Sequence, residues 1–546
     1  MSMTPEQIIK RHDQLESDRG TWESHWEEIA ERVIPRYKNS MERSTLNFTR
    51  GEKKTEKMFD STAALGLERF AAAMESMLTP RNSKWHRLMV MDTELSQDRE
   101  VKLFFETANN ILFKQRYSPK ANYASQQHEV YMGLGAFGTA AIFPDFHDEG
   151  GLRYSAIDLR EILFDMSHQG IIDTSYRKYT LTARQMKQRL DVGRFDSIPE
   201  SVTKALEKTP DKQFEVIHCV VPRTDFDPTR KDYKGKKWGS YYVSVAEQHA
   251  LSEGGFNTFP YPISRYVTGP GEIYGRSPAM LALPAIKVLN EQKKTMLTQG
   301  HRTVNPVLLS HDDGILDSFS LKPGAMNPGG VSAEGRALVH TLPVGNLAAG
   351  QELMDMERQV INDGFLVIND SFLVSLFQIL VDTPAMTATE VLERAREKGA
   401  LLSPTMGRQQ SEMLGPMIER ELDLLTQQGL LPELPPALIE AEGEYEIEYD
   451  SPLSRSQRSE EAAGWLRTLE AAIAYANTTQ DISVLDQFDI DVIYPALAEI
   501  NAVPASWMRG QEAVDQMRQQ RSQQQEIQQM VEAAPAAAGV MKQLQA

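Results

Sequence analysis

Apolar residues recur every three or four positions over much of the chain, a spacing that places them on one face of an α-helix. The N-terminal stretch shows this spacing at Trp22, Trp26, Ile29 and Val33. Thr4 and Pro5 supply a cap and a first turn, so one helix is predicted over residues 4–34. The same spacing predicts helices at 56–79, 97–117, 121–134, 182–191, 278–302, 347–379 and 388–428, and interrupted helix over 456–533.

Other segments carry the short, alternating or β-rich patterns that are typical of strands. These segments are residues 139–143, 152–157 and 161–165, a mixed strand region over 213–268, and the strictly alternating 444–449. Residues 304–346 combine strands with loops that are rich in glycine and proline. The pattern as a whole predicts an α+β fold in which helices predominate.

The predicted helix over 388–428 is unusually long. At ~1.5 Å per residue it would span roughly 60 Å. Pro404 and Pro416 lie inside it, and proline removes a backbone hydrogen bond and bends a helix. We expect one kinked helix, with two or three separate helices as the alternative. The helix over 278–302 has a clear start, because Ser277 can cap it and Pro278 suits its first turn.

Composition restricts the class of protein. The chain has 546 residues, 41% hydrophobic and 25% charged, which is ordinary for globular domains and long enough for three or four of them. Its net charge of −18 opposes tight, sequence-specific DNA binding, because DNA binders need a basic surface. No run of 18 apolar residues predicts a membrane span. The single cysteine, Cys219, excludes an internal disulfide and is expected to be a buried apolar residue.

Candidate chemistry is sparse, and we predict no catalytic site, cofactor or metal. Gly133, Gly135 and Gly138 match the dinucleotide fingerprint, but the order here is helix, glycines, strand, the reverse of what the fingerprint needs. A helix-to-strand turn is the favoured interpretation, and a nucleotide-dependent enzyme stays as an alternative. No Walker A motif occurs, and histidines do not cluster, so His218 is expected to be structural.

The helix over 278–302 is basic. Its cations are Lys287, Lys293, Lys294 and Arg302, with Glu291 as the only acid. In a solvated helix this is an ordinary charged face. In a helix that lines a DNA channel, it would be a sparse set of phosphate contacts.

Three groups of motifs occur along the chain, one near the N-terminus and two after residue 270. The segment from Gly271 to Pro278 reads Gly-Glu-Ile-Tyr-Gly-Arg-Ser-Pro and precedes Asn290-Glu291-Gln292-Lys293-Lys294. The segment from Asp382 to Val391 reads Asp-Thr-Pro-Ala-Met-Thr-Ala-Thr-Glu-Val and precedes Arg394. At the N-terminus, His12-Asp13-Gln14-Leu15 precedes Trp22, Trp26 and Ile34-Pro35. With these three groups in their order from the N-terminus to the C-terminus, the chain resembles the portal, or head-to-tail connecting, family of short-tailed double-stranded-DNA bacteriophages. The resemblance covers nearly its whole length.

The resemblance implies a ring, usually of twelve subunits, at one capsid vertex. It implies these segments: wing 1–277, stem helix 278–303, clip 304–346, second stem helix 347–372, channel (tunnel) loop 373–387, wing 388–455 with the kinked helix and a return strand, crown 456–510, and a Gln/Ala-rich helical tail or barrel 511–546. A heavily acidic ring would let DNA pass without sticking to it.

The same resemblance implies the partners and candidate residues. DNA would pass through the channel without sequence specificity, near Lys287, Lys293, Lys294, Arg302, Asp382, Thr383, Met386 and Thr387. Terminase, which packages the genome, and tail adaptors would dock near Asp312, Asp313, Asp317 and Lys322. Major capsid and scaffolding proteins would be further partners, and no membrane is expected. The chain would be made in the host cytoplasm and end in the virion. A tail adaptor or minor head protein is the alternative within phage structural proteins.

Overall fold

The computed structural model describes residues 3–37, 55, 57–81, 83–92, 95, 98–310, 320, 322–328, 330–332, 334–343, 345, 347–365, 404–440, 445–449, 464–475, 478, 488, 493–494, 497–498, 503, 507–509 and 514–524. The chain divides into two compact units. Unit 1 is Met1–Thr79 with Tyr117–Leu424, and unit 2 is Pro80–Arg116 with Leu425–Ala546.

The N-terminal helical pattern forms two helices, α1 (Pro5–Asp18) and α2 (Gly20–Arg32), and a short 3-10 turn, η1 (Pro35–Tyr37). The predicted single helix over 4–34 is therefore wrong. The break falls at Arg19, which is buried and donates to the carbonyl oxygens of Leu159 (2.8 Å) and Ile162 (2.8 Å). Thr4 caps α1 as predicted, because its side chain accepts a hydrogen bond from the Gln7 amide.

A five-stranded antiparallel sheet in unit 1 follows chain order. Its strands are β4 (Ile162–Met166), β5 (Ile172–Thr182), β6 (Gln213–Pro222), β7 (Trp238–Ser244) and β8 (His249–Phe256). Two helices, α6 (Ala183–Asp191) and α7 (Glu200–Lys208), lie between β5 and β6 in the chain, and the turn η4 (Tyr233–Gly235) precedes β7. The strand β5 and the helix α7 were not predicted, whereas helix 182–191 is confirmed.

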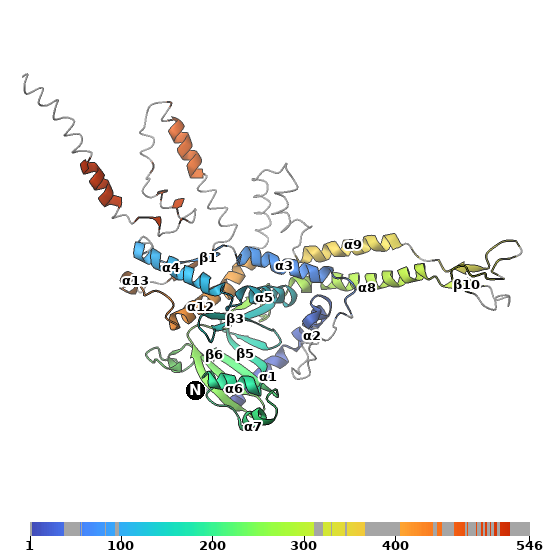
Figure 1. Ribbon diagram of the computed structural model, residues 1–546, viewed down its shortest axis with the longest axis horizontal. Coiled ribbons are helices and arrows are strands. Elements are labelled where there is room, and N and C mark those ends of the chain that lie inside the picture. Colours follow the sequence, from blue (N-terminus) through green and yellow to red (C-terminus); the bar gives the residue numbers. More distant parts are fainter. Residues whose placement is uncertain are drawn as a thin grey trace, which may run out of the picture. The chain divides into compact units, whose positions relative to one another are not determined.

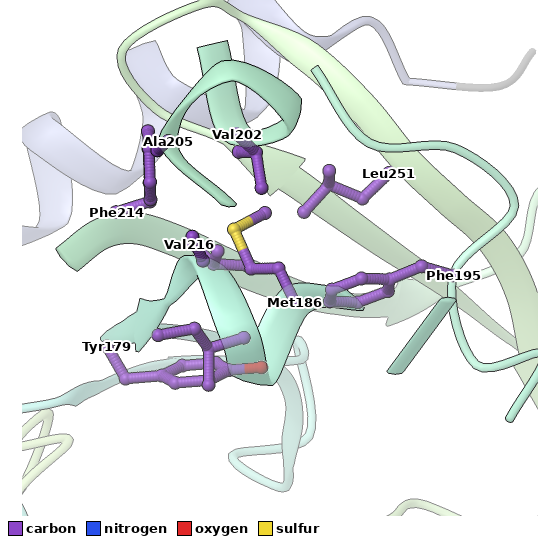
Figure 2. Close-up of a cluster of buried hydrophobic side chains, with 10 residues drawn as sticks. Tyr179, Met186, Phe195, Val202, Ala205, Phe214, Val216 and Leu251 are labelled. Carbon is purple, nitrogen blue, oxygen red and sulfur yellow. The ribbon is translucent and has the colours of Figure 1, made fainter. Parts of the chain in front are cut away.

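Alternation along β6 distributes its side chains between two cores. Cys219 belongs to a buried cluster with Ile8 of α1, which confirms that this cysteine is a buried apolar residue. Val216 faces the other way and belongs to a cluster with Met186 of α6 and Val202 of α7, shown in Figure 2. The sheet is thus covered by α1 on one face and by α6 and α7 on the other.

A smaller sheet is formed by β3 (Leu152–Ile157), β2 (Thr139–Phe146) and β9 (Ile263–Arg265), in the order β3-β2-β9. The helix α5 (Tyr123–Phe137) leads into β2 through Gly138, whose φ of 76° is left-handed. The helix α5 packs on α3 (Thr62–Leu78), because Gly135 leaves space for Leu67 and Phe70. The predicted helices 56–79 and 121–134 and the predicted strands 139–143, 152–157 and 161–165 are confirmed, with ends shifted by a few residues.

Two long helices, α8 (Pro278–Val304) and α9 (Leu347–Gly364), run side by side, with β10 beyond their far ends (Figure 1). The described part of their connection contains β10 (Leu308–Ser310), which pairs antiparallel with β11 (Val339–Thr341). The predicted helix 278–302 is confirmed. The predicted helix 347–379 is confirmed as far as Gly364, and its remainder lies outside the described residues apart from Phe365.

The predicted helix over 388–428 is described from Pro404 onward. Residues 404–409 are α-helical, Gln410–Leu414 form a π-helical turn, and α12 covers Gly415–Gln427. The Gly415 amide bonds to the Gln410 carbonyl, the wider spacing of a π turn. Pro416 has no amide hydrogen, and its ring would collide with a carbonyl four residues earlier in a regular helix, so the interruption falls where proline predicts it. Residues 388–403 lie outside the described residues.

Unit 2 is built from segments far apart in the chain. The strand β1 (His86–Val90) pairs antiparallel with β12 (Tyr445–Tyr449), which confirms the predicted strand 444–449, whereas β1 was not predicted. The helix α4 (Arg99–Arg116) confirms the prediction over 97–117, and α13 (Pro436–Glu440) is short. Residues 464–475 and 514–524 are helical, as predicted for parts of 456–533.

Candidate functional site

The α8–α9 hairpin begins at a tight backbone crossing. A Cβ atom on Gly275 would lie 2.3 Å from the carbonyl oxygen of Gly138. Hydrogen bonds fix the crossing: the Gly275 amide donates to Thr139 Oγ1 (2.8 Å) and the Tyr266 amide to the Gly138 carbonyl (2.9 Å). Only glycine fits at position 275, and the root of α8 is thereby fastened to the turn between α5 and β2.

Ser277 fixes the direction in which α8 leaves this crossing. Its hydroxyl accepts a hydrogen bond from the Met280 amide (3.0 Å), which confirms the predicted cap. The same hydroxyl donates to the Ala136 carbonyl at the end of α5 (2.7 Å). One side chain therefore caps one helix and joins it to the end of another.

Tyr274 connects two of the sequence motifs. It is buried, and its ring contacts Trp26 edge to face with ring centroids 5.2 Å apart and Trp22 at 6.0 Å. Arg276 lies over the Trp22 ring (5.4 Å) and pairs with Glu272 (2.5 Å). The N-terminal tryptophans and the Tyr-Gly-Arg-Ser-Pro segment are thus one packed cluster at the base of α8.

Small residues set the register between the two long helices. A Cβ atom on Gly364 would lie 3.1 Å from that of Ala282, and one on Gly350 would lie 2.4 Å from the Met296 sulfur. The helices are antiparallel, since the end of α9 meets the start of α8. Met354 and Ile361 of α9 are buried on the same side of that helix.

An extended segment before α3 crosses this hairpin and ties its helices together. The buried Asn290 of α8 accepts hydrogen bonds from the amides of Phe59 (2.8 Å) and Asp60 (3.2 Å). The Asp60 carboxylate pairs with Arg358 of α9 (2.8 Å) and accepts the Thr62 amide (2.9 Å). Burial alone would raise the pKa of Asp60, but the hydrogen bonds from Thr62 and Arg358 outweigh it and hold that pKa below its usual value.

The four predicted α8 cations differ in their surroundings. Lys287 pairs with Glu28 of α2 (2.6 Å), so it is already engaged within the chain. Lys294 is exposed and lies 5.9 Å from the Phe59 ring centroid, Arg302 is exposed, and Lys293 is half-buried. Within the described residues, these three cations have no carboxylate within ion-pair distance.

The predicted docking and channel residues fall mostly outside the described residues. These are Asp312, Asp313, Asp317, Asp382, Thr383, Met386 and Thr387. Lys322 is described, exposed and in a turn of the α8–α9 connection. Met326 nearby is 93% exposed, so the described part of this connection presents an apolar side chain to solvent.

The glycine fingerprint does not form a phosphate-binding turn. Gly133 and Gly135 lie within α5, and a Cβ atom on Gly135 would lie 2.6 Å from Leu67 and Phe70 side chains. A cavity of about 410 Å³ lies beside Gly133, but its two arginines pair with acids that also line it, Arg36 with Glu129 (2.6 Å) and Arg160 with Asp158 (3.0 Å). The glycines therefore serve helix packing and the turn into β2, as the reversed order indicated.

The predicted structural role of His218 is confirmed. It is buried in β6, bonded to Tyr261 Oη (2.6 Å) and Ser240 Oγ (2.9 Å), and stacked on Tyr242 with centroids 4.0 Å apart. Burial, reinforced by nearby Arg177 and Arg189, lowers its pKa well below the usual value. In the described part of the chain, His12, Asp13 and Glu16 offer ligand atoms within 4.8 Å of one another, but the described contact of His12 is with Asp13 (3.2 Å).

Comparisons with known proteins identify the class. The chain belongs to the family of bacteriophage head to tail connecting proteins, whose model matches residues 5–508. It is 29% identical over 527 residues to the "Probable portal protein" of Bordetella phage BPP-1, covering 95% of this chain and 91% of that protein. It is 26% identical over 547 residues to the "Portal protein" of Salmonella phage epsilon15, covering 99% and 95%. Among the described residues, no helix combines the length and apolar character needed to span a bilayer.

Proposed function

We propose that this chain is the subunit of a phage portal, a ring that forms the DNA channel at one capsid vertex. The observation that carries the proposal is its likeness, over nearly the full length of both chains, to two proteins named as portal proteins. The genome would enter through this ring during packaging and leave through it during ejection. The motor would be a separate terminase, and the portal would have no catalytic activity of its own.

The antiparallel α8–α9 hairpin supports the assignment of segments. In this proposal α8 and α9 are the stem, residues 304–346 are the clip, and residues 373–387 are the channel loop. The wing would comprise 1–277 and 388–455, followed by the crown at 456–510 and a tail or barrel at 511–546. An exposed clip would suit docking of terminase first and of tail adaptors later, near Lys322 and the aspartates at 312, 313 and 317.

We propose fewer DNA-contacting residues in the channel than the pattern of basic residues in α8 alone would indicate. Lys287 is the weakest candidate, because Glu28 already neutralises it. Arg302 is exposed near the C-terminal end of α8, and Lys293 is half-buried. With a net charge of −18 on each subunit, such cations would be isolated contacts on a repelling wall, which suits rapid passage of DNA.

A phage that lacks this chain tests the proposal against its nearest alternative. The wild-type chain supplied from a plasmid should restore DNA-filled, infectious particles. If the chain is the portal, the phage that lacks it should form heads that contain no genome, because packaging has no entry point. DNA-filled heads without tails would instead identify a tail adaptor. A variant that lacks residues 304–346 should form rings but fail to bind purified terminase.

A further inference from the structure

The two helices of the hairpin carry opposite charge. Helix α8 has Lys287, Lys293, Lys294 and Arg302 against the single acid Glu291. Helix α9 has Glu352, Asp355, Glu357 and Asp363 against the single base Arg358. These charges are largely unmatched inside the hairpin, since the ion pairs described for its residues link Lys287 to Glu28, and Arg358 to Asp60 and Asp355.

Helix geometry places two of these charges on the outer edges of the hairpin. Ala282 marks the side of α8 that faces α9, and Gly350 marks the side of α9 that faces α8. At ~100° per residue, Lys294 lies about 120° around α8 from Ala282, and Glu352 lies about 160° around α9 from Gly350. Both side chains are exposed. Lys294 therefore lies on the outer side of α8, which also carries the exposed Glu291, and Glu352 lies on the outer side of α9.

The register places the two charges at the same height. Met296 is opposite Gly350. Lys294 comes two residues before Met296, and Glu352 comes two residues after Gly350, so in antiparallel helices the two are level. If a second hairpin lay beside the first with its axis parallel, Lys294 of one copy would face Glu352 of the other.

Apolar side chains are also exposed on the outer sides of the two helices. Val288 of α8 is 44% exposed and Met356 of α9 is 60% exposed. The register places them within about two residues of the same height. At ~100° per residue, Val288 lies about 120° around α8 from Lys294, on the other flank of the outer side, and Met356 lies about 40° around α9 from Glu352. A neighbouring copy would cover both.

We propose that the occupant of each edge is a second copy of this chain, with Lys294 of one subunit paired to Glu352 of the next and Val288 packed against Met356. The inference rests on the proposed portal function and specifies the contact that closes its ring. The contact is heterologous, because it joins two different edges, and such contacts form a ring when their rotation closes. Lys294 is thereby assigned to assembly, whereas Arg302 lies beyond the acids of α9 and stays available to DNA.

Cysteine cross-linking tests the juxtaposition directly. Cys219 is the only natural cysteine and is buried, so introduced cysteines will react selectively. The full-length double variant Lys294→Cys/Glu352→Cys, treated with a short bismaleimide, should give a ladder of covalent oligomers on a denaturing gel. Each single variant should give no ladder. The matched control Lys294→Cys/Gln351→Cys moves one thiol by one residue to another side of α9 and should give a much weaker ladder.

Charge reversal tests how much the pairing of Lys294 with Glu352 contributes to assembly. Lys294→Glu and Glu352→Lys should each raise the protein concentration needed for half-assembly roughly tenfold, because like charges would meet at every interface. The double exchange should return it to within about twofold of wild type, and Gln351→Lys should have little effect. Circular dichroism would verify that each variant is folded.

The outcomes separate this inference from the proposed function. Wild-type rings that give no ladder, or an exchange variant that assembles no better than the single reversals, would overturn the Lys294–Glu352 contact and leave the portal proposal intact. A wild-type chain that forms no ring would overturn the portal proposal itself.

Discussion

Gly138 and Gly275 meet backbone to backbone, and a Cβ atom on either would lie 2.3 Å from the other's carbonyl oxygen. This crossing joins the turn after α5 to the segment that starts α8. The glycine that looked like part of a nucleotide fingerprint is thus a close-contact residue, and its partner lies in the Tyr-Gly-Arg-Ser-Pro segment. The root of the hairpin depends on two residues 137 positions apart, by subtraction of their numbers.

Substitution at this crossing should strongly destabilise the folded protein. Gly275→Ala should lower the free energy of unfolding by about 3 kcal/mol, because the added methyl group meets backbone that cannot move aside. Gly300→Ala is the matched control, since Gly300 lies within α8 and has open space around its Cβ position. It should stabilise the protein by about 0.5–1 kcal/mol. Urea unfolding of both variants measures the difference, and equal stabilities would contradict the close contact.

Asn290 should be required for the segment that ties α8 to α9. Asn290→Ala leaves the amides of Phe59 and Asp60 without their acceptor, which should cost about 1–3 kcal/mol. Amide hydrogen exchange at Phe59 and Asp60 should become faster in this variant. Thr295→Ala, at an exposed position of the same helix, should leave both stability and exchange unchanged. Unaltered exchange in Asn290→Ala would show that the segment is held by other contacts.

The ion pair between Arg265 and Glu412 should anchor the π-helical turn to β9. The Glu412 carboxylate accepts from Arg265 Nε (2.8 Å) and Nη2 (2.7 Å), and the Arg265 side chain is almost fully buried. Glu412→Gln should cost about 2 kcal/mol, because hydrogen bonds to charged groups contribute 1.5–3 kcal/mol. A double-mutant cycle with Arg265→Gln measures the coupling, and Ser411→Ala serves as a control. Additive effects would contradict the pairing.

Stability should decrease as the pH falls below about 6.5, the ordinary histidine pKa. The folded protein keeps His218 neutral, because burial, Arg177 and Arg189 lower its pKa well below that value. The unfolded chain takes up the proton more readily, so acid favours unfolding. His218→Gln removes the titrating group and should make the urea midpoint less dependent on pH between about 7.5 and 5.5. Residual dependence is expected from His12, whose pKa burial also lowers. Identical slopes would contradict this role of His218.

His86 should also make the stability of unit 2 decrease at acidic pH. Arg116 is fully buried and donates to His86 Nε2 (2.9 Å), and an arginine has no acceptor, so the ring proton of His86 is on Nδ1. Burial and Arg116 lower the pKa of His86 well below the usual value. His86→Gln should reduce the acid sensitivity of unit 2, which hydrogen exchange in β1 and α4 would measure. Unchanged exchange at acidic pH would exclude this histidine as a cause.

The sequence predicts local elements better than their long-range partners. The alternation in 444–449 identified β12, but its partner β1 lies far away in the chain, and no local pattern indicates the pairing. The break at Arg19 depends on carbonyl groups in residues 159–162. Polar residues obscured β5, since Arg177 and Lys178 lie in the middle of that strand.

In the candidate site, too, some features follow from local sequence and others depend on tertiary contacts. Ser277 and the basic face of α8 follow from local sequence, and both are present in the structure. The tie through Asp60 and Arg358 joins residues from distant segments, so no spacing rule could indicate it. The difference between Lys287, which Glu28 engages, and Lys294, which is exposed, also depends on tertiary contacts.

We propose that this chain assembles as a portal ring. Electron microscopy of the purified full-length protein tests it most directly, with particle mass measured on the same sample. We expect closed rings with a central hole and a mass that is one fixed multiple of 61.5 kDa. A protein that stays monomeric at all accessible concentrations would contradict it.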